Sequence, residues 1–314
     1  SVQKNTHVYN VSVITKYIKI IKRSILDCRT ISQLSFCLLL LCTGCEDSLW
    51  NNPYPNQDSA KNIHYDSFSE RPKHLDPVSS YSSNEYVFLG QIYEPPLQYH
   101  FLKRPYELIP LTAAVLPKPR FFDKDGQLLK EGSNLEDIYR VKYKISIKPD
   151  ILYQPHPAFA KSESGKYLYH DLNTKKLSNI NALSDFNMVG TRKLLAKDYV
   201  YQIKRMAHPR THSPISGLMA KYILGLNEFA EKLSKIEKDN PGLSFIDLND
   251  YELPGVRVID DTTFEIILSQ KYPQFLYWLS MSFFAPMPWE ADYFYSQEGM
   301  TDKNITLDWY PVGT

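Results

Sequence analysis

The segment that decides the fold is Ala196-Lys197-Asp198-Tyr199-Val200-Tyr201-Gln202-Ile203-Lys204-Arg205. Apolar residues recur in and around it at the spacing of one helix face: Leu195, Tyr199, Ile203 and Met206. The pair His208-Pro209 marks the end of the periodic stretch, because proline cannot continue a helix. We therefore expect an amphipathic helix from Leu194 to Met206.

Working outward from this helix, the chain predicts both strands and further helices. Tyr139 to Ile147 alternates apolar and polar residues, as a half-buried strand does, and Val256 to Leu268 predicts a hairpin around Asp260-Asp261. Glu85 to Glu94 has apolar residues at helical spacing and stops at two prolines, and Ile215 to Lys235 is expected to be further helix. Tyr153 to Gly190 is polar and poorly periodic, which indicates an insertion loop. The fold class is accordingly α/β, with helices and strands mixed along the chain.

Composition excludes several classes of partner and reaction. The 314 residues carry 36 Lys+Arg against 35 Asp+Glu, so no nucleic-acid partner is expected, and 43% hydrophobic residues suffice for a core. Twenty-three tyrosines and 21 prolines suit strands joined by irregular connections. No GxGxxG and no GxxxxGK[ST] occurs, which argues against a nucleotide-phosphate loop.

The four cysteines, Cys28, Cys37, Cys42 and Cys45, all lie near the beginning of the sequence. A catalytic cysteine or a disulfide in the body of the protein is therefore excluded, and Cys42-Thr43-Gly44-Cys45 lacks the second pair that a zinc ribbon needs. Basic residues precede an apolar run, Phe36 to Cys42, that is too short to span a bilayer and is typical of a secretory signal. Thr43-Gly44-Cys45 resembles the lipobox of bacterial lipoproteins, which implies lipid attachment at Cys45. Cys42 stands where that motif usually has Leu, and an ordinary cleaved signal is the alternative.

Five short segments carry a resemblance through their order: Gln91 to Pro95, Tyr143 to Asp150, Ala196 to Arg205, Val256 to Ile266 and Pro311 to Thr314. Their order resembles that of motifs in the family 5 extracellular solute-binding proteins, the receptors of peptide-type ABC importers. Gln91-Ile92-Tyr93-Glu94-Pro95 resembles the family's "IYEPL", and Tyr143 to Asp150 its "TFxLRPGVKF" strand. Ala196 to Arg205 resembles "TAxDVVYSIKR", with Leu195 where the family has a capping Thr. Val256 to Ile266 resembles "VxVxDDxTVxI", and Pro311-Val312-Gly313-Thr314 the start of "PVGTGPY". The order of the motifs, more than any one of them, carries the resemblance.

The resemblance implies a periplasmic binding protein type II-like fold of which this chain holds the first lobe, with mixed sheets and flanking helices. Its division would be a signal peptide with lipobox (1–45), a tether (46–61), the first part of lobe I (62–94), an additional domain of lobe I (95–288) with an insertion (153–190), and the start of the return to lobe I (289–314). Family members continue into a second lobe, so we expect an N-terminal fragment. The charge partners of ligand termini would then lie in that lobe, and the chain alone would bind ligand weakly.

The function implied is that of a non-catalytic receptor in the bacterial periplasm, anchored to the cell membrane by lipid, that captures extended peptides for import. Its expected partners are a peptide and the permease subunits of an ABC transporter, and it would act as a monomer without a cofactor or metal. The segment Ser79-Ser80-Tyr81-Ser82-Ser83-Asn84 resembles the family's cleft-facing loop, where hydroxyl and amide groups could meet a peptide backbone. Ile215 stands where some members place a ligand contact, although core packing explains it better.

Rival interpretations find less support in the residues. The same family fold could serve a sugar, nickel or haem, and a secreted hydrolase is a further alternative. His208 and His212 are spaced like helical metal ligands, but Pro209 breaks the helix between them. No GxSxG is present, and Asp260-Asp261 fits turn chemistry better than a catalytic pair. His156 and His170 are expected to be solvated, and strand packing is expected to explain the many tyrosines.

Overall fold

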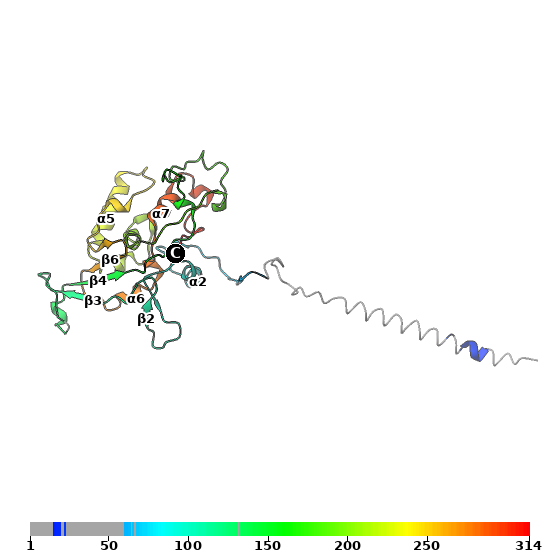
Figure 1. The fold of residues 1–314 in the computed structure, drawn as a ribbon, viewed down its shortest axis with the longest axis horizontal. Helices are drawn as coiled ribbons and strands as arrows, with labels where there is room; N and C mark the ends of the chain where they lie inside the picture. Colours follow the sequence, from blue (N-terminus) through cyan, green and yellow to red (C-terminus); the bar gives the residue numbers. More distant parts are fainter. Residues whose placement is uncertain (1–14, 20–21, 23–59, 64, 66, 131) are drawn as a thin grey trace, which may run out of the picture. The chain divides into compact units, whose positions relative to one another are not determined.

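The computed structural model describes residues 15–19, 22, 60–63, 65, 67–130 and 132–314. Cys45, the signal segment and most of the tether lie outside these residues. The chain divides into two units, 1–67 and 68–314, and the second holds the fold considered below (Figure 1). No helix within the described ranges has the length and apolar content needed to cross a bilayer.

A four-stranded sheet organises the second unit. Its strands are β3 (Pro119–Phe122), β4 (Arg140–Ser146), β5 (Val256–Asp260) and β6 (Thr263–Leu268), in the spatial order β3-β4-β6-β5. A separate pair is formed by β1 (Leu97–Tyr99) and β2 (Leu108–Pro110). The second unit contains both helices and strands, so the α/β class is confirmed. Every pairing in these two sheets is antiparallel, so the expected mixture of parallel and antiparallel strands is not found. Short connections such as the β5–β6 hairpin favour that arrangement, since parallel neighbours need a long crossover.

The predicted β5–β6 hairpin forms, and its turn is closed by one carboxylate. Asp260 Oδ1 accepts hydrogen bonds from the backbone N–H of Thr262 at 2.9 Å and from its hydroxyl at 3.0 Å. This is the usual role of an aspartate at a tight turn. The interpretation of Asp260-Asp261 as turn chemistry is confirmed for Asp260.

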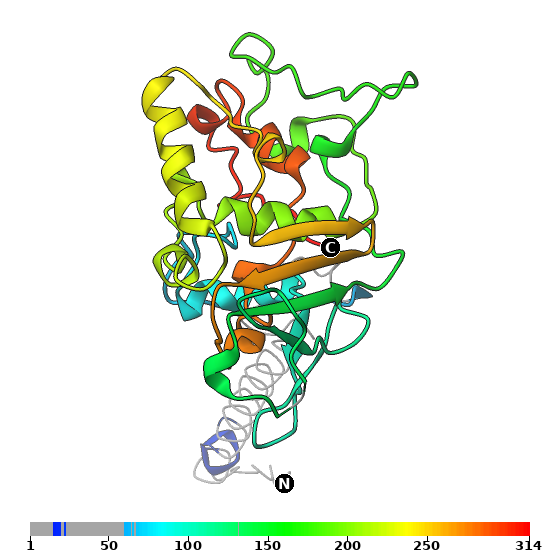
Figure 2. The same cartoon turned by 90° about the vertical axis from the view of Figure 1, so that its left-hand side faces the viewer.

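Helix α3 (Ala196–Arg205) lies against the sheet next to β5 and β6 (Figure 2). Its predicted apolar side is buried, with Tyr199, Ile203 and Met206 each 1% exposed. The polar side is buried as well, because Asp198, Lys204 and Arg205 are all less than 10% exposed. The predicted helix is confirmed, and the burial of its polar side is a feature that the sequence pattern did not predict. A helix can be enclosed in this way only if its charged side chains find partners inside the protein.

The other helices are α2 (Ser83–Ile92), α4 (Ser216–Met219), α5 (Leu226–Asp239), α6 (Phe275–Trp278) and α7 (Trp289–Ser296). The helix expected from Ile215 to Lys235 is broken into α4 and α5. Gly225 separates them with a φ of 74°, a left-handed conformation that glycine adopts without steric cost. A side chain there would also press on Pro254, whose Cδ would lie 3.0 Å from the added Cβ.

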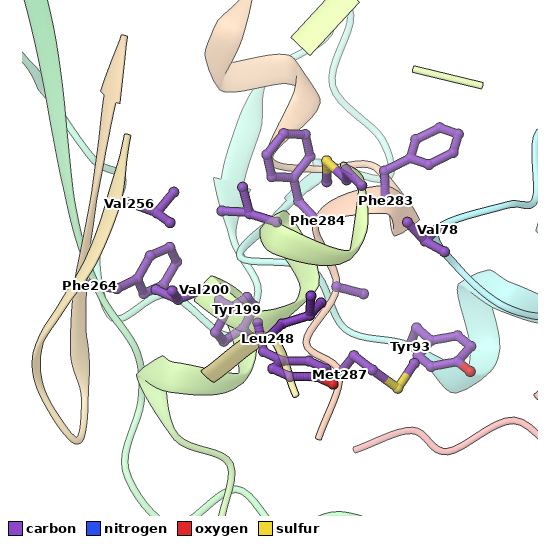
Figure 3. Close-up of a cluster of buried hydrophobic side chains, with 14 of the residues drawn as sticks. Val78, Tyr93, Tyr199, Val200, Leu248, Val256, Phe264, Phe283, Phe284 and Met287 are labelled. Carbon is purple, nitrogen blue, oxygen red and sulfur yellow. The ribbon is translucent and has the colours of Figure 1, made fainter. Parts of the chain in front are cut away.

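The core is built where α3 meets the sheet and the segment from Phe283 to Met287 (Figure 3). Tyr199 stacks on Phe264 of β6, with 5.1 Å between ring centroids and 7° between planes. The Tyr199 hydroxyl lies 2.6 Å from the hydroxyl of Thr112, so its one polar atom is satisfied inside the core. Burying an aromatic side chain of this kind stabilises the fold by about 1.5–3 kcal/mol. Among the buried tyrosines of the described residues, Tyr143 is on a strand while Tyr199 and Tyr201 are on α3, so strand positions account for only part of them.

The stretch from Tyr153 to Gly190 has little regular structure, as a loop would, and much of it is exposed, but the part from His156 to Ala160 is buried. His156 is 1% exposed, and burial lowers its pKa to about 3. Its Nδ1 accepts the backbone N–H of Ala158 at 3.1 Å, so the proton is on Nε2, which donates to the Tyr295 hydroxyl at 2.8 Å. Tyr295 in turn donates to the carbonyl of Tyr310 at 2.6 Å. His170 is also partly buried and stacks on Tyr167, so the prediction of solvated histidines was wrong.

The C-terminal residues lie beside the end of α2 (Figure 1). Val312 donates its backbone N–H to the Tyr93 hydroxyl at 3.3 Å, and the Thr314 hydroxyl donates to Glu94 Oε2 at 3.0 Å. Gly313 packs so closely on Ile92 that an added Cβ would lie 1.8 Å from its carbonyl oxygen. Only glycine fits this approach, which fixes the last described segment against α2.

Candidate functional site

The loop before α2 is held in place by one carboxylate, Glu85. Its two oxygens accept hydrogen bonds of 2.8–3.3 Å from five groups: the backbone N–H of Lys73, His74, Tyr81 and Ser82, and the hydroxyl of Ser80. Burial raises the pKa of Glu85, but these hydrogen bonds outweigh it and lower the pKa from 4.5 to about 2. The anion also lies in the first turn of α2, where the helix dipole favours negative charge. The segment that contains Ser80 to Ser83 is therefore firmly positioned.

A buried ion cluster joins the same loop to α3. Arg205 makes two parallel hydrogen bonds to Asp76, at 2.7 and 3.0 Å, and a third to Asp292 of α7 at 3.1 Å. The Tyr201 hydroxyl donates to the other oxygen of Asp292 at 2.7 Å. Arg205 is 3% exposed, and two carboxylates balance its charge. The Leu75-Asp76-Pro77 loop is thereby fixed to the centre of the protein.

A second buried cluster holds the other end of α3. Arg192 binds Asp198 and Glu290 through four hydrogen bonds of 2.7–2.8 Å. Asp198 Oδ2 also accepts the backbone N–H of Leu195 at 2.9 Å. That bond satisfies an N–H at the start of α3, where Leu195 offers no side-chain oxygen of its own. Asp198 thus compensates for the missing capping residue.

Along α2 the surface is hollowed into three neighbouring cavities of about 420, 170 and 530 Å³. The first two share Tyr86, Leu89 and Ser282, and the second and third share Tyr99. We call this surface the α2 groove, and its lining comprises Ser80–Ser83, Tyr86, Leu89, Gly90, Tyr93, Pro95, Gln98, Tyr99, Pro105, Tyr106, Leu111, Tyr277, Trp278, Ser280–Phe283. Tyr86, Leu89, Gly90 and Tyr93 follow the spacing of one helix face, so α2 forms one wall.

Aromatic rings dominate the groove and many are open to solvent. Tyr99 lies between Tyr106, at 5.6 Å, and Tyr277, at 6.2 Å between ring centroids. Tyr81 contacts Phe283 at 6.2 Å at the other end. Tyr81 and Tyr86 are 72% and 56% exposed. Exposed rings grouped around a hollow are a common feature of surfaces that bind a ligand or another protein.

A fourth cavity, of about 900 Å³, lies on a different side of α2 and has another character. It is lined by charged groups, among them Arg71, Lys73 and Asp308, and by Trp309, over which the Arg71 guanidinium lies at 3.6 Å. Charged side chains therefore line the cavity on this side of α2, whereas the α2 groove has none in its lining.

The six residues predicted from the cleft-facing loop do not all share one place. Ser80, Tyr81, Ser82 and Ser83 line the α2 groove. The Ser79 hydroxyl instead donates to the carbonyl of Thr211 at 2.7 Å, and Asn84 lines the charged cavity. Ile215 is 3% exposed and belongs to the hydrophobic core. The structure thus brings four of the predicted residues together at one hollow surface.

Sequence reasoning missed most of the groove. Tyr86, Gly90 and Tyr93 could have been found from their helical spacing along Glu85 to Glu94. Tyr277, Trp278, Met281 and Phe283 come from a segment about 200 residues away, and no local pattern links them to α2. Within the described ranges, no three Cys, His, Asp or Glu side chains lie close enough together to hold a metal ion. The groove can therefore offer ring faces, hydroxyls and an amide to a bound molecule.

Comparison with known proteins gives matches among solved structures alone. No protein-family model matches the chain, and no curated protein matches it. Listeria monocytogenes OppA bound to peptide is 17% identical over 70% of this chain and 29% of that chain, with a TM-score of 0.39. The Helicobacter pylori periplasmic binding protein DppA, in complex with the peptide STSA, is 16% identical over 77% of this chain and 33% of that chain, with a TM-score of 0.42.

The murein tripeptide binding protein MppA of Escherichia coli is 16% identical over 71% of this chain and 30% of that chain, with a TM-score of 0.42. The chain thus spans about a third of the length of these structures or slightly less. All three are peptide-binding proteins, by their names or by the peptide bound in the structure.

Proposed function

We propose that the chain forms part of a peptide receptor and that the α2 groove receives the ligand. The observation that carries this proposal is that Ser80 to Ser83, singled out by their place in the motif order, lie at a hollow lined by exposed aromatic rings. A peptide in extended form could offer its N–H and C=O groups to the exposed side chains of Ser82 and Ser83 while its own side chains pack on the rings. Glu85 and the Asp76–Arg205 pair keep that surface in shape before any ligand arrives, which lowers the entropic cost of binding.

Binding without turnover fits this lining better than hydrolysis. The residues of the α2 groove include no Asp, Glu, His, Lys or Cys, so the lining offers a general base only in its tyrosines, a residue type that is protonated at neutral pH. The serines would need such a base to become nucleophiles. A bound peptide should consequently leave the protein unchanged.

The experiment is a calorimetric titration of the natural full-length protein with peptides of two to five residues. Gly90→Trp should weaken binding at least tenfold, because an indole at Gly90 would fill the middle of the groove. Val87→Trp is the matched control: it adds the same ring to the same helix, at a residue that is 54% exposed and does not line the groove. Saturable binding that survives Gly90→Trp would contradict the proposed site. Cleaved peptide, detected by mass spectrometry, would contradict the receptor function.

Delivery of the peptide to the permease subunits of an ABC importer, from a lipid-anchored position in the periplasm, completes the proposal. Its support is the lipobox-like Thr43-Gly44-Cys45 after a basic and apolar leader. Acyl chains contribute about 0.8 kcal/mol per buried methylene, so two chains anchor a protein stably. Labelled palmitate should be incorporated in the bacterial host and lost in Cys45→Ala. Equal labelling of both forms would contradict the anchor.

A further inference from the structure

The α2 groove differs from an ordinary protein surface in its lack of charge. None of the side chains that line its three cavities is Lys, Arg, Asp, Glu or His. The charged cavity on the other side of α2, with Arg71, Lys73 and Asp308, shows that the same helix can border a different chemistry. The groove is therefore an uncharged strip bounded by polar regions.

The charged groups closest in sequence to the groove already have polar or aromatic contacts within the protein. Glu85 accepts hydrogen bonds from its own loop, and Glu94 Oε2 accepts the hydroxyl of Thr314. Lys103 pairs with Glu107 at 2.9 Å, and the Arg104 guanidinium lies over the Tyr106 ring at 4.3 Å. None of these charged groups belongs to the lining of the groove, so a charged ligand side chain beside Tyr86 would lie against uncharged side chains and would lose water on entering.

What the groove does offer is apolar area with hydroxyl edges. Tyr86 and Tyr99, in the middle of the groove, are 56% and 44% exposed, so a ligand side chain could cover their rings. Each apolar ligand side chain removed from water there would contribute favourably to the free energy of binding, and an aromatic one could stack on the face of a tyrosine ring. An ammonium or carboxylate would lose hydration without compensation.

We propose that the α2 groove selects peptide segments with uncharged, apolar or aromatic side chains and discriminates against lysine and glutamate. This selectivity rests on the proposed function, since it presumes that a peptide is the ligand. The occupant is thus a neutral stretch of extended peptide, and charge on a ligand has to be placed outside the groove.

The test measures dissociation constants of four pentapeptides for the natural full-length protein, all alanine except for a central Phe, Leu, Lys or Glu. We expect the Phe and Leu peptides to bind at least tenfold more tightly than the Lys and Glu peptides. Tyr86→Glu, which places a carboxylate in the shared wall of two cavities, should raise the affinity for the Lys peptide and lower it for the Glu peptide. Val87→Glu adds the same charge to the same helix outside the groove and should change neither.

The outcomes separate the two claims. Equal binding of all four peptides would overturn the selectivity while the receptor function stands. The same holds if Tyr86→Glu and Val87→Glu behave alike. Binding of no peptide would overturn the receptor function itself, and binding of maltotriose in place of peptides would show that the tyrosine rings stack on a sugar.

Discussion

The surroundings of α3 and the groove along α2 differ in where charged side chains lie. Around α3, Arg192 and Arg205 contact three buried carboxylates and a partly buried one, Asp292, and each guanidinium makes at least three hydrogen bonds to them. The α2 groove, which is open to solvent, has no charged side chain in its lining. Ordinary proteins show the reverse, with charge outside and apolar groups inside.

The difference teaches how the loops of this protein are fixed. Buried ion pairs contribute little net stability compared with apolar packing, but they are strongly directional. The Asp76–Arg205 pair joins a loop to a helix 129 residues away in the sequence. Ion pairs thus fix the loop before α2 in one place. The α2 groove that this loop supports has no charged lining and can bind a ligand by packing.

The largest effect should follow from breaking the interior side of this comparison. Arg205→Ala would leave the buried Asp76 and the partly buried Asp292 without their cation, and we expect the free energy of unfolding to fall by about 3–5 kcal/mol. Lys103→Ala, which removes half of an exposed pair with Glu107, should cost no more than about 1 kcal/mol. Urea unfolding followed by circular dichroism measures both. Similar small losses would mean that the Arg205 cluster is not a structural anchor.

The second prediction uses pH to separate the interior from the groove. The folded pKa of His156, about 3, is below its ordinary value of 6.5, so the fold favours the neutral ring and stability is lost as pH falls below 6.5. This one group should lower the free energy of unfolding by about 2 kcal/mol between pH 7 and pH 5. His156→Gln should lack that component, while peptide affinity, which no lining carboxylate or imidazole controls, should stay constant. Identical pH slopes for the two proteins would contradict the assignment.

How much of this the sequence could predict depends on how far apart the partners are. Leu195, Tyr199, Ile203 and Met206 indicated α3 correctly, because a helix face is a local pattern. The burial of Asp198 and Arg205 was missed, since their partners come from residues 76, 192, 290 and 292 and local periodicity cannot show that a polar face is covered. His156 was missed for the same reason: its partner Tyr295 is 139 residues away.

The groove follows the same rule. Ser80 to Ser83 were found from the order of motifs along the chain, which is information about neighbours in sequence. The wall contributed by Tyr277 to Phe283 appears only when α6 and the segment after it fold back onto α2. The absence of charge in the lining could not be predicted either, because it is a property of residues that only the fold brings together.

The third prediction concerns Glu85, the buried carboxylate that holds the loop lining one end of the α2 groove. Glu85→Gln should cost about 1–3 kcal/mol at pH 7, because one amide cannot accept all five hydrogen bonds that the carboxylate accepts. The folded pKa of about 2 is below the ordinary 4.5, so this contribution is present above pH 4.5 and disappears as pH falls toward 2. Urea unfolding of both proteins at pH 7 and at pH 3 measures the change. A difference that is as large at pH 3 as at pH 7 would indicate that the carboxylate charge is not what fixes the loop.

The smallest effect, and the one most specific to the groove, is expected at Gly90. This glycine lies inside α2 with an ordinary helical φ, and an added Cβ would meet only the Tyr86 ring, at 3.6 Å. Gly90→Ala should therefore raise the free energy of unfolding by about 0.5–1 kcal/mol, since alanine loses less backbone entropy on folding. Gly225→Ala should have the opposite sign, because Gly225 has a φ of 74° and a Cβ there would crowd Pro254. Thermal unfolding of both variants provides the measurement. If Gly90→Ala is more stable, the backbone does not require glycine at this position, and the open space that glycine leaves beside Tyr86 is what suits the groove. If the variant is less stable, Gly90 is needed for the packing of α2 instead.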